Sequence, residues 1–294
     1  MQKWNLVFDL TRCTGCHNCT LSVQDEYVGN AFPGYAAPMP LRGARWVELR
    51  RRDRGAFPAV DVAFLFQACQ HCDDPPCMRV ARDGAVRKRE DGIVIIDPER
   101  ARGQKQIVDA CPYGAVHWNE ELQLPQHWNF DAHLIDAGWR APRPVQACPT
   151  AALRALKVTD EEMQNIAVAE GLVTLQADRG HGARLYYRHL SRFTHEFVAG
   201  TLVGVEGPHE ACIAGARATL LHNGARVGEA TSDAFGDFRF DALSPGSGAY
   251  RIDIAAEGYC RRTIDFELAK SCWLGEISLE PLHSESDRSP AHPL

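Results

Sequence analysis

The chain has 294 residues, of which 45% are hydrophobic and 24% are charged, and its formal net charge is −6. This acidic balance argues against a nucleic-acid-binding protein, because such proteins normally carry a basic surplus. No run of about 18 apolar residues occurs, so we expect no membrane-spanning segment. The length allows two domains.

The first ten residues, MQKWNLVFDL, have the alternation of a β-strand and lead directly into the first cysteine group. They contain neither the apolar region nor the small-residue cleavage site of a signal peptide. We therefore expect a protein that stays in the cytoplasm.

Eleven cysteines are present, and six of them fall in two tight groups within the first 150 residues. The first group is Cys13, Cys16 and Cys19, with the spacing of a bacterial ferredoxin motif whose fourth position is Val23. The second group lies in CQHCDDPPC, residues 69–77. Tight groups without an export signal favour metal or cluster ligands over a disulfide framework.

Two stretches of the first half resemble each other. LVFDLTRCTGCHNCTLSV begins at Leu6, and IVIIDPERARGQKQIVDAC begins at Ile93. When Asp9 is aligned with Asp97, the first copy keeps the first three ligand positions and the second copy keeps only the fourth, Cys111. Such a repeat indicates duplicated units, each with a strand, a ligand loop and a helical turn, as in a ferredoxin half-module.

The missing ligands can come from distant segments. In ferredoxins with paired motifs, the cysteine that precedes proline binds the other cluster. The chain has two such pairs, Cys111-Pro112 and Cys148-Pro149. Each completes one triplet, and each completed site would hold a [4Fe–4S] cluster. The two predicted ligand sets are Cys13, Cys16, Cys19 and Cys148, and Cys69, Cys72, Cys77 and Cys111.

Two further cluster positions have lost their ligands. The repeat spacing places them at Ala81, Ala101, Gln104 and Ile107, and at Val23, Trp128, Asp131 and Pro144. A single carboxylate cannot hold a cluster, so we predict two retained sites and two lost ones. Zinc bound by four thiolates is the alternative, although zinc sites need no third cysteine in each group.

Other residues have a functional and a structural interpretation. His17 and His71 lie inside the cysteine groups and are expected at the surface or an interface, with cluster ligation as the alternative. The arginine-rich residues 42–54 could dock onto an acidic partner or stabilise a reduced cluster, or they could form a solvated face of a strand or loop. Three cysteines without ligand spacing are expected to be buried thiols. They are Cys212, Cys260 and Cys272.

The second half changes character. Residues 159–170 predict an amphipathic helix with a capping box of Thr159 and Glu162 and a stop at Gly171. From about residue 196, short β-type runs take over, and Asn223-Gly224 predicts a hairpin.

These patterns together predict an α+β fold. We expect a double [4Fe–4S] ferredoxin-like module over residues 1–195 and a small all-β sandwich domain over residues 196–282. The polar residues 283–294 are expected to form a disordered tail.

The cysteine scaffold of residues 1–155 resembles the iron–sulfur subunits of molybdopterin oxidoreductases of the dimethyl-sulfoxide-reductase type, with eight of sixteen ligand positions kept. A narrower resemblance is to the small subunits of pyrogallol–phloroglucinol transhydroxylases and resorcinol hydroxylases. The stretches that carry it are PGYAA (33–37), RGARWVELRRRDRGAFP (42–58), EDGIVIIDPERARG (90–103), ACPYGAVHWNEE (110–121), AHLID (132–136), LYYRHLSRF (185–193) and FGDFRFDAL (235–243).

The resemblance implies a non-catalytic electron-transfer subunit with two [4Fe–4S] clusters. Catalysis would take place in a large partner subunit that holds molybdopterin as bis-MGD, and the heterodimer would exchange electrons with an external acceptor. The implied reaction is the hydroxylation or transhydroxylation of polyhydroxylated benzenes of the resorcinol or pyrogallol type in anaerobic aromatic degradation. The alternatives are a subunit that serves another substrate of the same superfamily, and a zinc-stapled binding protein without a redox role.

Overall fold

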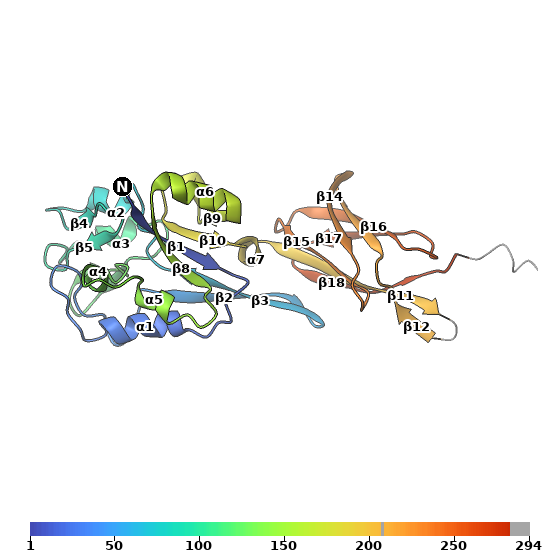
Figure 1. The fold of residues 1–294 in the computed structure, drawn as a ribbon, viewed down its shortest axis with the longest axis horizontal. Helices are drawn as coiled ribbons and strands as arrows, with labels where there is room; N and C mark the ends of the chain where they lie inside the picture. Colours follow the sequence, from blue (N-terminus) through green and yellow to red (C-terminus); the bar gives the residue numbers. More distant parts are fainter. Residues whose placement is uncertain (207–208, 283–294) are drawn as a thin grey trace, which may run out of the picture. The chain divides into compact units, whose positions relative to one another are not determined.

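The computed structural model describes residues 1–206 and 209–282. Contacts divide the chain into two compact units (Figure 1). One contains residues 1–52 and 63–193, and the other contains residues 53–62 and the chain from Thr194 onward. The predicted disordered tail, residues 283–294, lies outside the described residues. Within the described ranges, no helix is long and apolar enough to cross a membrane.

The first unit mixes short strands and helices. Before residue 127 they are β1 (Lys3–Asp9), α1 (Asn18–Tyr27), β2 (Glu48–Ala56), β3 (Ala59–Gln67), α2 (Pro76–Val80), β4 (Val86–Lys88), β5 (Val94–Ile96), α3 (Gln106–Asp109), β6 (His117–Asn119) and β7 (Leu124–Gln126). Later in the chain are α4 (Ala132–Asp136), α5 (Arg143–Gln146), β8 (Leu153–Val158), α6 (Asp160–Glu170), β9 (Leu172–Thr174), η1 (Ala177–Arg179), β10 (Leu185–Arg188) and α7 (Ser191–Thr194), the last of which ends at the start of the second unit.

A four-stranded sheet with the order β8-β1-β10-β9 supports the cluster loops. The predicted N-terminal strand is confirmed as β1, which pairs antiparallel with β8 and parallel with β10. Its alternate residues enter different cores, because Leu6 and Phe8 join the main core whereas Val7 packs with Met163 of α6. The strand is therefore buried on both faces, whereas an alternating pattern usually indicates a strand with one face exposed.

The predicted helix over residues 159–170 is confirmed as α6, which begins at Asp160. Thr159 accepts a hydrogen bond from the Glu162 backbone N–H at 3.2 Å, and the Glu162 carboxylate accepts one from the Thr159 N–H at 2.8 Å. Both halves of the capping box are thus present. The helix ends at Gly171, whose φ of 62° is the left-handed conformation expected of a C-terminal glycine.

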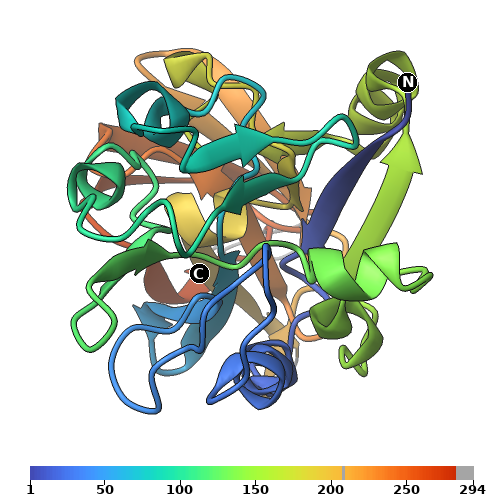
Figure 2. The same ribbon diagram turned by 90° about the vertical axis from the view of Figure 1, so that its left-hand side faces the viewer.

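The two copies of the internal repeat have the predicted order of elements. The first runs from β1 through residues 10–17 into α1, and the second runs from β5 through residues 97–105 into α3. Residues from about 70 to 130, drawn from cyan to green in Figure 2, form mainly loops and short elements around the second copy. Gly15 in the first loop has a φ of +72°, and a Cβ there would lie 2.3 Å from the Phe64 ring. Glycine is therefore required where this loop passes over β3.

The second unit is built mainly from strands. They are β11 (Glu196–Glu206), β12 (His209–Cys212), β13 (Arg217–His222), β14 (Ala225–Thr231), β15 (Asp237–Leu243), β16 (Gly248–Ala255), β17 (Arg262–Leu268) and β18 (Cys272–Leu279). One four-stranded sheet has the order β12-β11-β15 with β18 also paired to β11, and the other has the order β14-β13-β16-β17. Val198 and Leu202 of the first sheet share one apolar core with Leu220 and Ile252 of the second.

The predicted hairpin is confirmed between β13 and β14. His222 pairs with Ala225, and the two turn residues have φ values of 51° at Asn223 and 77° at Gly224. Two positive φ angles in succession are the signature of a type I′ turn. Strands β12 and β18 were not predicted from the sequence.

The arginine-rich residues 42–54 do not form one solvated face. Arg42 and Arg45 are exposed, but Arg54 is buried. Its guanidinium lies 2.5 Å from the Asp61 carboxylate and 3.4 Å from that of Asp241. Both interpretations proposed for the stretch are therefore wrong for Arg54, which serves as an internal ion-pair partner at the tip of the β2–β3 hairpin.

Candidate metal centres

The structure brings together the four cysteines of one predicted set, here named the Cys69 quartet (Cys69, Cys72, Cys77 and Cys111). Cys69 and Cys72 lie in the loop after β3, Cys77 lies in α2, and Cys111 follows α3. Burial raises the pKa of the Cys69 thiol well above its usual value, and the neighbouring sulfurs of the other three raise it further. These four sulfurs are therefore electrostatic neighbours.

The second set, here named the Cys13 quartet (Cys13, Cys16, Cys19 and Cys148), is also brought together. Cys13 and Cys16 lie between β1 and α1, Cys19 lies in the first turn of α1, and Cys148 follows α5. Burial raises the pKa of Cys13, with further increases from Cys148 and Cys16. The pKa of Cys19 rises to about 12 through burial and the proximity of Cys13. The distant Cys148 thus lies beside the N-terminal triplet.

The raised pKa values bear on how these sites would bind metal. Burial raises the pKa of Cys72 to about 12 and that of Cys77 to about 11. These thiols are protonated at neutral pH in the metal-free chain. Because thiolates are the ligand form, binding of iron would displace these protons.

The backbone around the sulfurs fits a cluster. The His71 N–H lies 3.5 Å from the Cys69 sulfur, and the Ala115 N–H lies 3.4 Å from the Cys111 sulfur. In the other quartet, the Gly15 N–H donates to Cys13 and lowers its pKa against the effect of burial. Hydrogen bonds to ligand sulfurs are one of the means by which proteins set cluster potentials.

A buried histidine, His71, lies between Cys69 and Cys72 in the ligand loop. His71 Nδ1 accepts from the Val94 N–H at 3.1 Å, so the hydrogen of the neutral ring is on Nε2. Burial lowers the pKa of His71 well below its usual value, and among the described residues Nε2 has no hydrogen-bond partner. The ring packs edge-on against His127, Trp128 and Phe130, with centroid distances of 6.0, 6.0 and 5.6 Å. The expectation that His71 lies at the surface is wrong, whereas His17 is exposed.

A half-buried cation supports the same quartet. Lys88 Nζ donates to the carbonyl oxygens of His71, Cys72 and Gly92 at 2.7, 2.8 and 2.7 Å. It also lies 3.3 Å from the Asp73 carboxylate and lowers the pKa of Cys72. Lys88 therefore holds the ligand loop in place and supplies positive charge next to groups that become thiolates.

A zinc ion and a [4Fe–4S] cluster require different spacings of their four thiolates. In the described ranges, no group of three or more His, Cys, Asp or Glu side chains is gathered closely enough to hold one metal ion. A tetrahedral zinc site with Zn–S bonds of about 2.3 Å places its sulfurs about 3.8 Å apart. The four thiolates of a [4Fe–4S] cluster bind separate irons, so their sulfurs lie farther apart.

Most of the residues at the two predicted lost cluster positions are buried. At one of them, Ala101 and Ile107 are fully buried in an apolar core that includes Cys77. Gln104 accepts from the Arg82 N–H at 2.8 Å and donates to the Arg100 carbonyl at 2.7 Å. At the other position the side chains are also buried, and they are Val23, Trp128, Asp131 and Pro144.

The remaining cysteines lie in the second unit. Cys212 is exposed, and Cys260 and Cys272 are half-buried. The expectation that they are fully buried thiols is therefore wrong. Cys212 is the last residue of β12, Cys260 lies between β16 and β17, and Cys272 is the first residue of β18.

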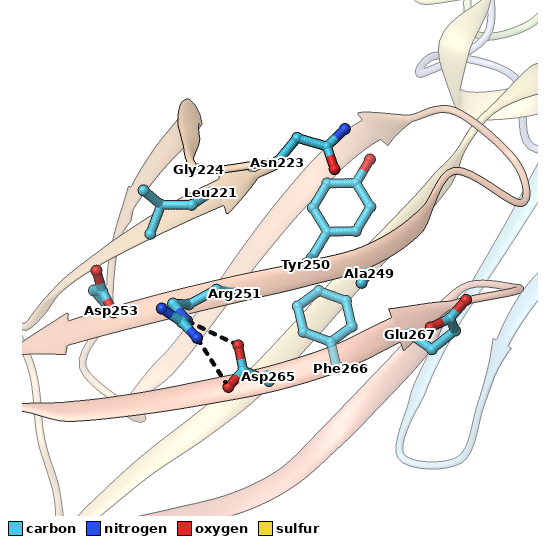
Figure 3. A pocket seen from close by; sticks show the side chains of 10 residues that line it. All are labelled: Leu221, Asn223, Gly224, Ala249, Tyr250, Arg251, Asp253, Asp265, Phe266 and Glu267. Atoms are coloured by element: carbon cyan, nitrogen blue, oxygen red, sulfur yellow. Dashed lines mark hydrogen bonds and ion pairs between the residues drawn. The ribbon is translucent and has the colours of Figure 1, made fainter.

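A surface groove of about 750 Å³ lies on the sheet that contains β13, β16 and β17 (Figure 3). Tyr250 and Phe266 stack with ring centroids 5.6 Å apart, and Arg251 pairs with Asp265 at 2.8 Å. The residues that line the groove include no cysteine. It is therefore not a candidate for the metal chemistry.

Comparisons with known proteins agree with this geometry. Residues 60–158 match the model of the 4Fe-4S dicluster domain family. The pyrogallol hydroxytransferase small subunit of Pelobacter acidigallici is 39% identical over 261 residues, covering 88% of this chain and 92% of that protein. This chain belongs to the same family. Its membership confirms the resemblance drawn from the sequence.

Other relatives match a smaller part. The thiosulfate reductase electron transfer subunit of Salmonella typhi is 29% identical over 63% of this chain and 92% of its own length. The B subunit of the anaerobic dimethyl sulfoxide reductase of Escherichia coli is 32% identical over 51% of this chain and 72% of its own length. The chain is therefore an iron–sulfur electron-transfer subunit of an oxidoreductase, and the α+β class is confirmed with a 4Fe-4S domain.

Proposed function

We propose that this chain is the electron-transfer subunit of a heterodimer whose large subunit carries molybdopterin and hydroxylates or transhydroxylates polyhydroxylated benzenes. The observation that supports this substrate class is the extent of the similarity. The pyrogallol hydroxytransferase small subunit aligns with 88% of the chain, whereas the thiosulfate and dimethyl sulfoxide reductase subunits align with 63% and 51%. Similarity to the first protein therefore extends beyond the cysteine scaffold that all of them share.

We further propose two [4Fe–4S] clusters, one in the Cys13 quartet and one in the Cys69 quartet. When bound, such clusters accept and release single electrons. The residues of this chain would hold them, exclude water and set their electrostatic surroundings through N–H···S contacts and Lys88. The segment that matches the dicluster family contains five of the eight ligands and leaves out the first triplet, so the Cys13 quartet rests on the contacts described above.

The finer description of the fold is part of the proposal. Two strand–loop–helix copies support a double ferredoxin-like module over residues 1–195. Two sheets around one apolar core support a β-sandwich over residues 196–282, with an interaction or structural role. The contact-based division differs in placing residues 53–62 with the second unit. A cytoplasmic location remains a prediction.

The experiment is anaerobic purification of the chain with its large subunit. We expect a brown complex whose visible absorption is bleached by dithionite, with iron and acid-labile sulfide for two clusters per chain. Pyrogallol and resorcinol should be converted, whereas thiosulfate and dimethyl sulfoxide should not. A colourless zinc-containing protein would refute the cluster assignment. A brown complex that reduces sulfur compounds and leaves phenols unchanged would refute the substrate class alone.

A further inference from the structure

A buried carboxyl occupies the vacated cluster position next to the Cys13 quartet. Val23 and Trp128 belong to the same apolar core as Cys19, and Asp131 is fully buried beside them. A carboxyl in such surroundings needs hydrogen-bond donors, because an unpaired buried polar group is costly. Burial raises the pKa of Asp131, although its donors oppose this effect.

Asp131 accepts hydrogen bonds from three residues, two of which lie in other segments of the chain. Its Oδ1 accepts from Trp128 Nε1 at 2.9 Å and from the Tyr27 hydroxyl at 3.0 Å, whose single hydrogen is shared with Asn129 Oδ1 at 2.6 Å. Its Oδ2 accepts from the Arg143 backbone N–H at 2.7 Å. Tyr27 is the last residue of α1, and Arg143 is the first residue of α5. The carboxyl therefore links the two helices directly.

The backbone turns sharply to place this carboxyl. Phe130 and Asp131 have φ values of 63° and 51°, in the left-handed region that residues with side chains rarely adopt. Two such residues in succession persist only where surrounding contacts hold them. The Asp131 carbonyl also accepts the Leu134 N–H at 2.9 Å at the start of α4. The local strain is thus maintained at the position where the carboxyl meets its three donors.

The two linked helices carry ligands of the same quartet. Cys19 lies in the first turn of α1, and Cys148 follows α5 by two residues. The Arg143 guanidinium strengthens the link through an ion pair with Asp25 at 2.5 Å and a second one with Glu26. At the other end of α1, the Asn18 amide lies 3.5 Å from the Ala147 carbonyl. Figure 1 shows α1 and α5 side by side.

We propose that Asp131 is a positioning residue that holds α5 against α1 and thereby places Cys148 opposite the N-terminal triplet. A cluster at the vacated position would have joined the same segments through its ligands, and the carboxyl with its three donors takes over that cross-link. This inference rests on the proposed function, because it assumes that Cys148 completes a cluster with the N-terminal triplet.

The test is Asp131→Asn in the full chain, purified anaerobically with its large subunit. An amide offers one oxygen and turns an NH₂ group toward at least one of the three donors, so the link is broken. We expect the electron paramagnetic resonance signal of the Cys13-quartet cluster to fall at least twofold in occupancy or to change in shape. The signal of the Cys69-quartet cluster should keep its shape, potential and occupancy.

Two further variants make the test selective. Asp136→Asn is the matched control, because Asp136 is a carboxylate of the adjoining helix α4 that binds Arg89 and Tyr35 instead of α1 or α5. It should leave both signals unchanged. Tyr27→Phe removes the hydroxyl that Asp131 shares with Asn129, and it should change the same signal as Asp131→Asn, to a smaller degree. If the Asp131→Asn variant does not fold, the Tyr27→Phe variant alone tests the proposal.

The inference is overturned if both signals stay as in the wild type in Asp131→Asn, or if both decline together in Tyr27→Phe. Failure of the proposed function looks different. In that case the wild-type complex lacks the second cluster, or Cys148→Ser leaves both clusters in place.

Discussion

The two cysteine quartets differ in how far the protein encloses them. In the Cys69 quartet, Cys72 and Cys77 are buried and the other two sulfur-bearing residues are half-buried. In the Cys13 quartet, only Cys19 is buried and Cys16 is exposed. One centre is thus set into the fold and the other lies at the surface of the same unit. Solvent exposure is one of the factors that set cluster potentials, so we expect the two centres to differ in potential and in reactivity.

The charges near the quartets differ as well. Near the Cys69 quartet, Lys88 donates to the carbonyl oxygens of His71, Cys72 and Gly92. Near the Cys13 quartet, the cation that lowers the pKa of Cys13 is Arg192, from the helical turn after β10. Arg192 donates to the Leu10 carbonyl at 3.1 Å, just before the cysteine loop. The two quartets therefore have different electrostatic surroundings, which allows the potential of each centre to be set separately.

The largest expected effect comes from removing the cysteine that each quartet takes from a distant segment. Cys111→Ser should abolish the enclosed cluster and Cys148→Ser the exposed one, each lowering iron content by about half, because a four-thiolate site loses one ligand. Iron and sulfide analysis with electron paramagnetic resonance would show which signal disappears. Cys212→Ser, at an exposed cysteine of the second unit, is the control and should change neither. If both clusters survive either substitution, the assignment of that quartet is wrong.

The sequence predicted this pairing because cluster ligands follow strict local spacing, and because the cysteine before proline completes the neighbouring site. The capping box of α6 and the Asn223-Gly224 hairpin were predicted for a similar reason. In each case the determining contacts lie within a few residues of one another. Local rules therefore found the helix cap and the hairpin turn, and the same kind of rule predicts the ligand groups.

The surroundings of the quartets could not be predicted in the same way. The burial of His71 depends on contacts with His127, Trp128 and Phe130, which lie more than 50 residues away in the chain. Lys88 and Asp131 look like ordinary surface residues until the fold places carbonyl oxygens or donors around them. Strand β18 was missed because it pairs in parallel with β11, and such pairing leaves no hairpin signal in the sequence.

The second-largest expected effect is a difference in the rates at which chemical reagents destroy the two clusters. When the anaerobic complex is exposed to ferricyanide or an iron chelator, the Cys13-quartet cluster should be lost several-fold faster, because its Cys16 is open to solvent. The decay of the two electron paramagnetic resonance signals over time measures this order. Docking of the large subunit over Cys16 would abolish the difference in the complex and leave it in the isolated small subunit. Faster loss of the Cys69-quartet cluster in both preparations would contradict the comparison.

Removal of the half-buried cation Lys88 should shift the potential of one centre and leave that of the other unchanged. In Lys88→Met, the reduced Cys69-quartet cluster loses a stabilising positive charge, so its midpoint potential should fall by about 60 mV, equivalent to about 1.4 kcal/mol for one electron. Redox titration followed by electron paramagnetic resonance measures both centres in one sample. Lys105→Met removes an exposed charge near Trp118 and should shift neither potential by a comparable amount. An equal shift at both centres would mean that Lys88 acts through the fold as a whole.

The smallest expected effect concerns the ion pairs that fasten α1 beside the Cys13 quartet. Burial tends to raise the pKa of Glu26, but hydrogen bonds from His133 and Arg143 outweigh it and hold the pKa below the usual 4.5. A carboxylate with a lowered pKa in the folded state stabilises the protein above pH 4.5, and this contribution is lost as the pH falls toward the folded-state value. Glu26→Gln should therefore cost about 1–2 kcal/mol at pH 7.

The pH dependence separates this interaction from simple packing. The difference in melting temperature between wild type and Glu26→Gln should stay constant from pH 7 to about pH 5.5 and shrink below about pH 4.5, because the wild-type carboxylate then loses its charge. Glu170→Gln breaks the more exposed ion pair between Glu170 of α6 and Arg154 of β8, and it should lower the free energy of unfolding by less at every pH. A melting difference that stays the same down to about pH 3.5 would mean that Glu26 acts by its shape. The charge of the Arg143–Glu26 pair would then contribute nothing to stability, and α5 would be held to α1 by the Arg143–Asp25 pair and the hydrogen bonds of Asp131.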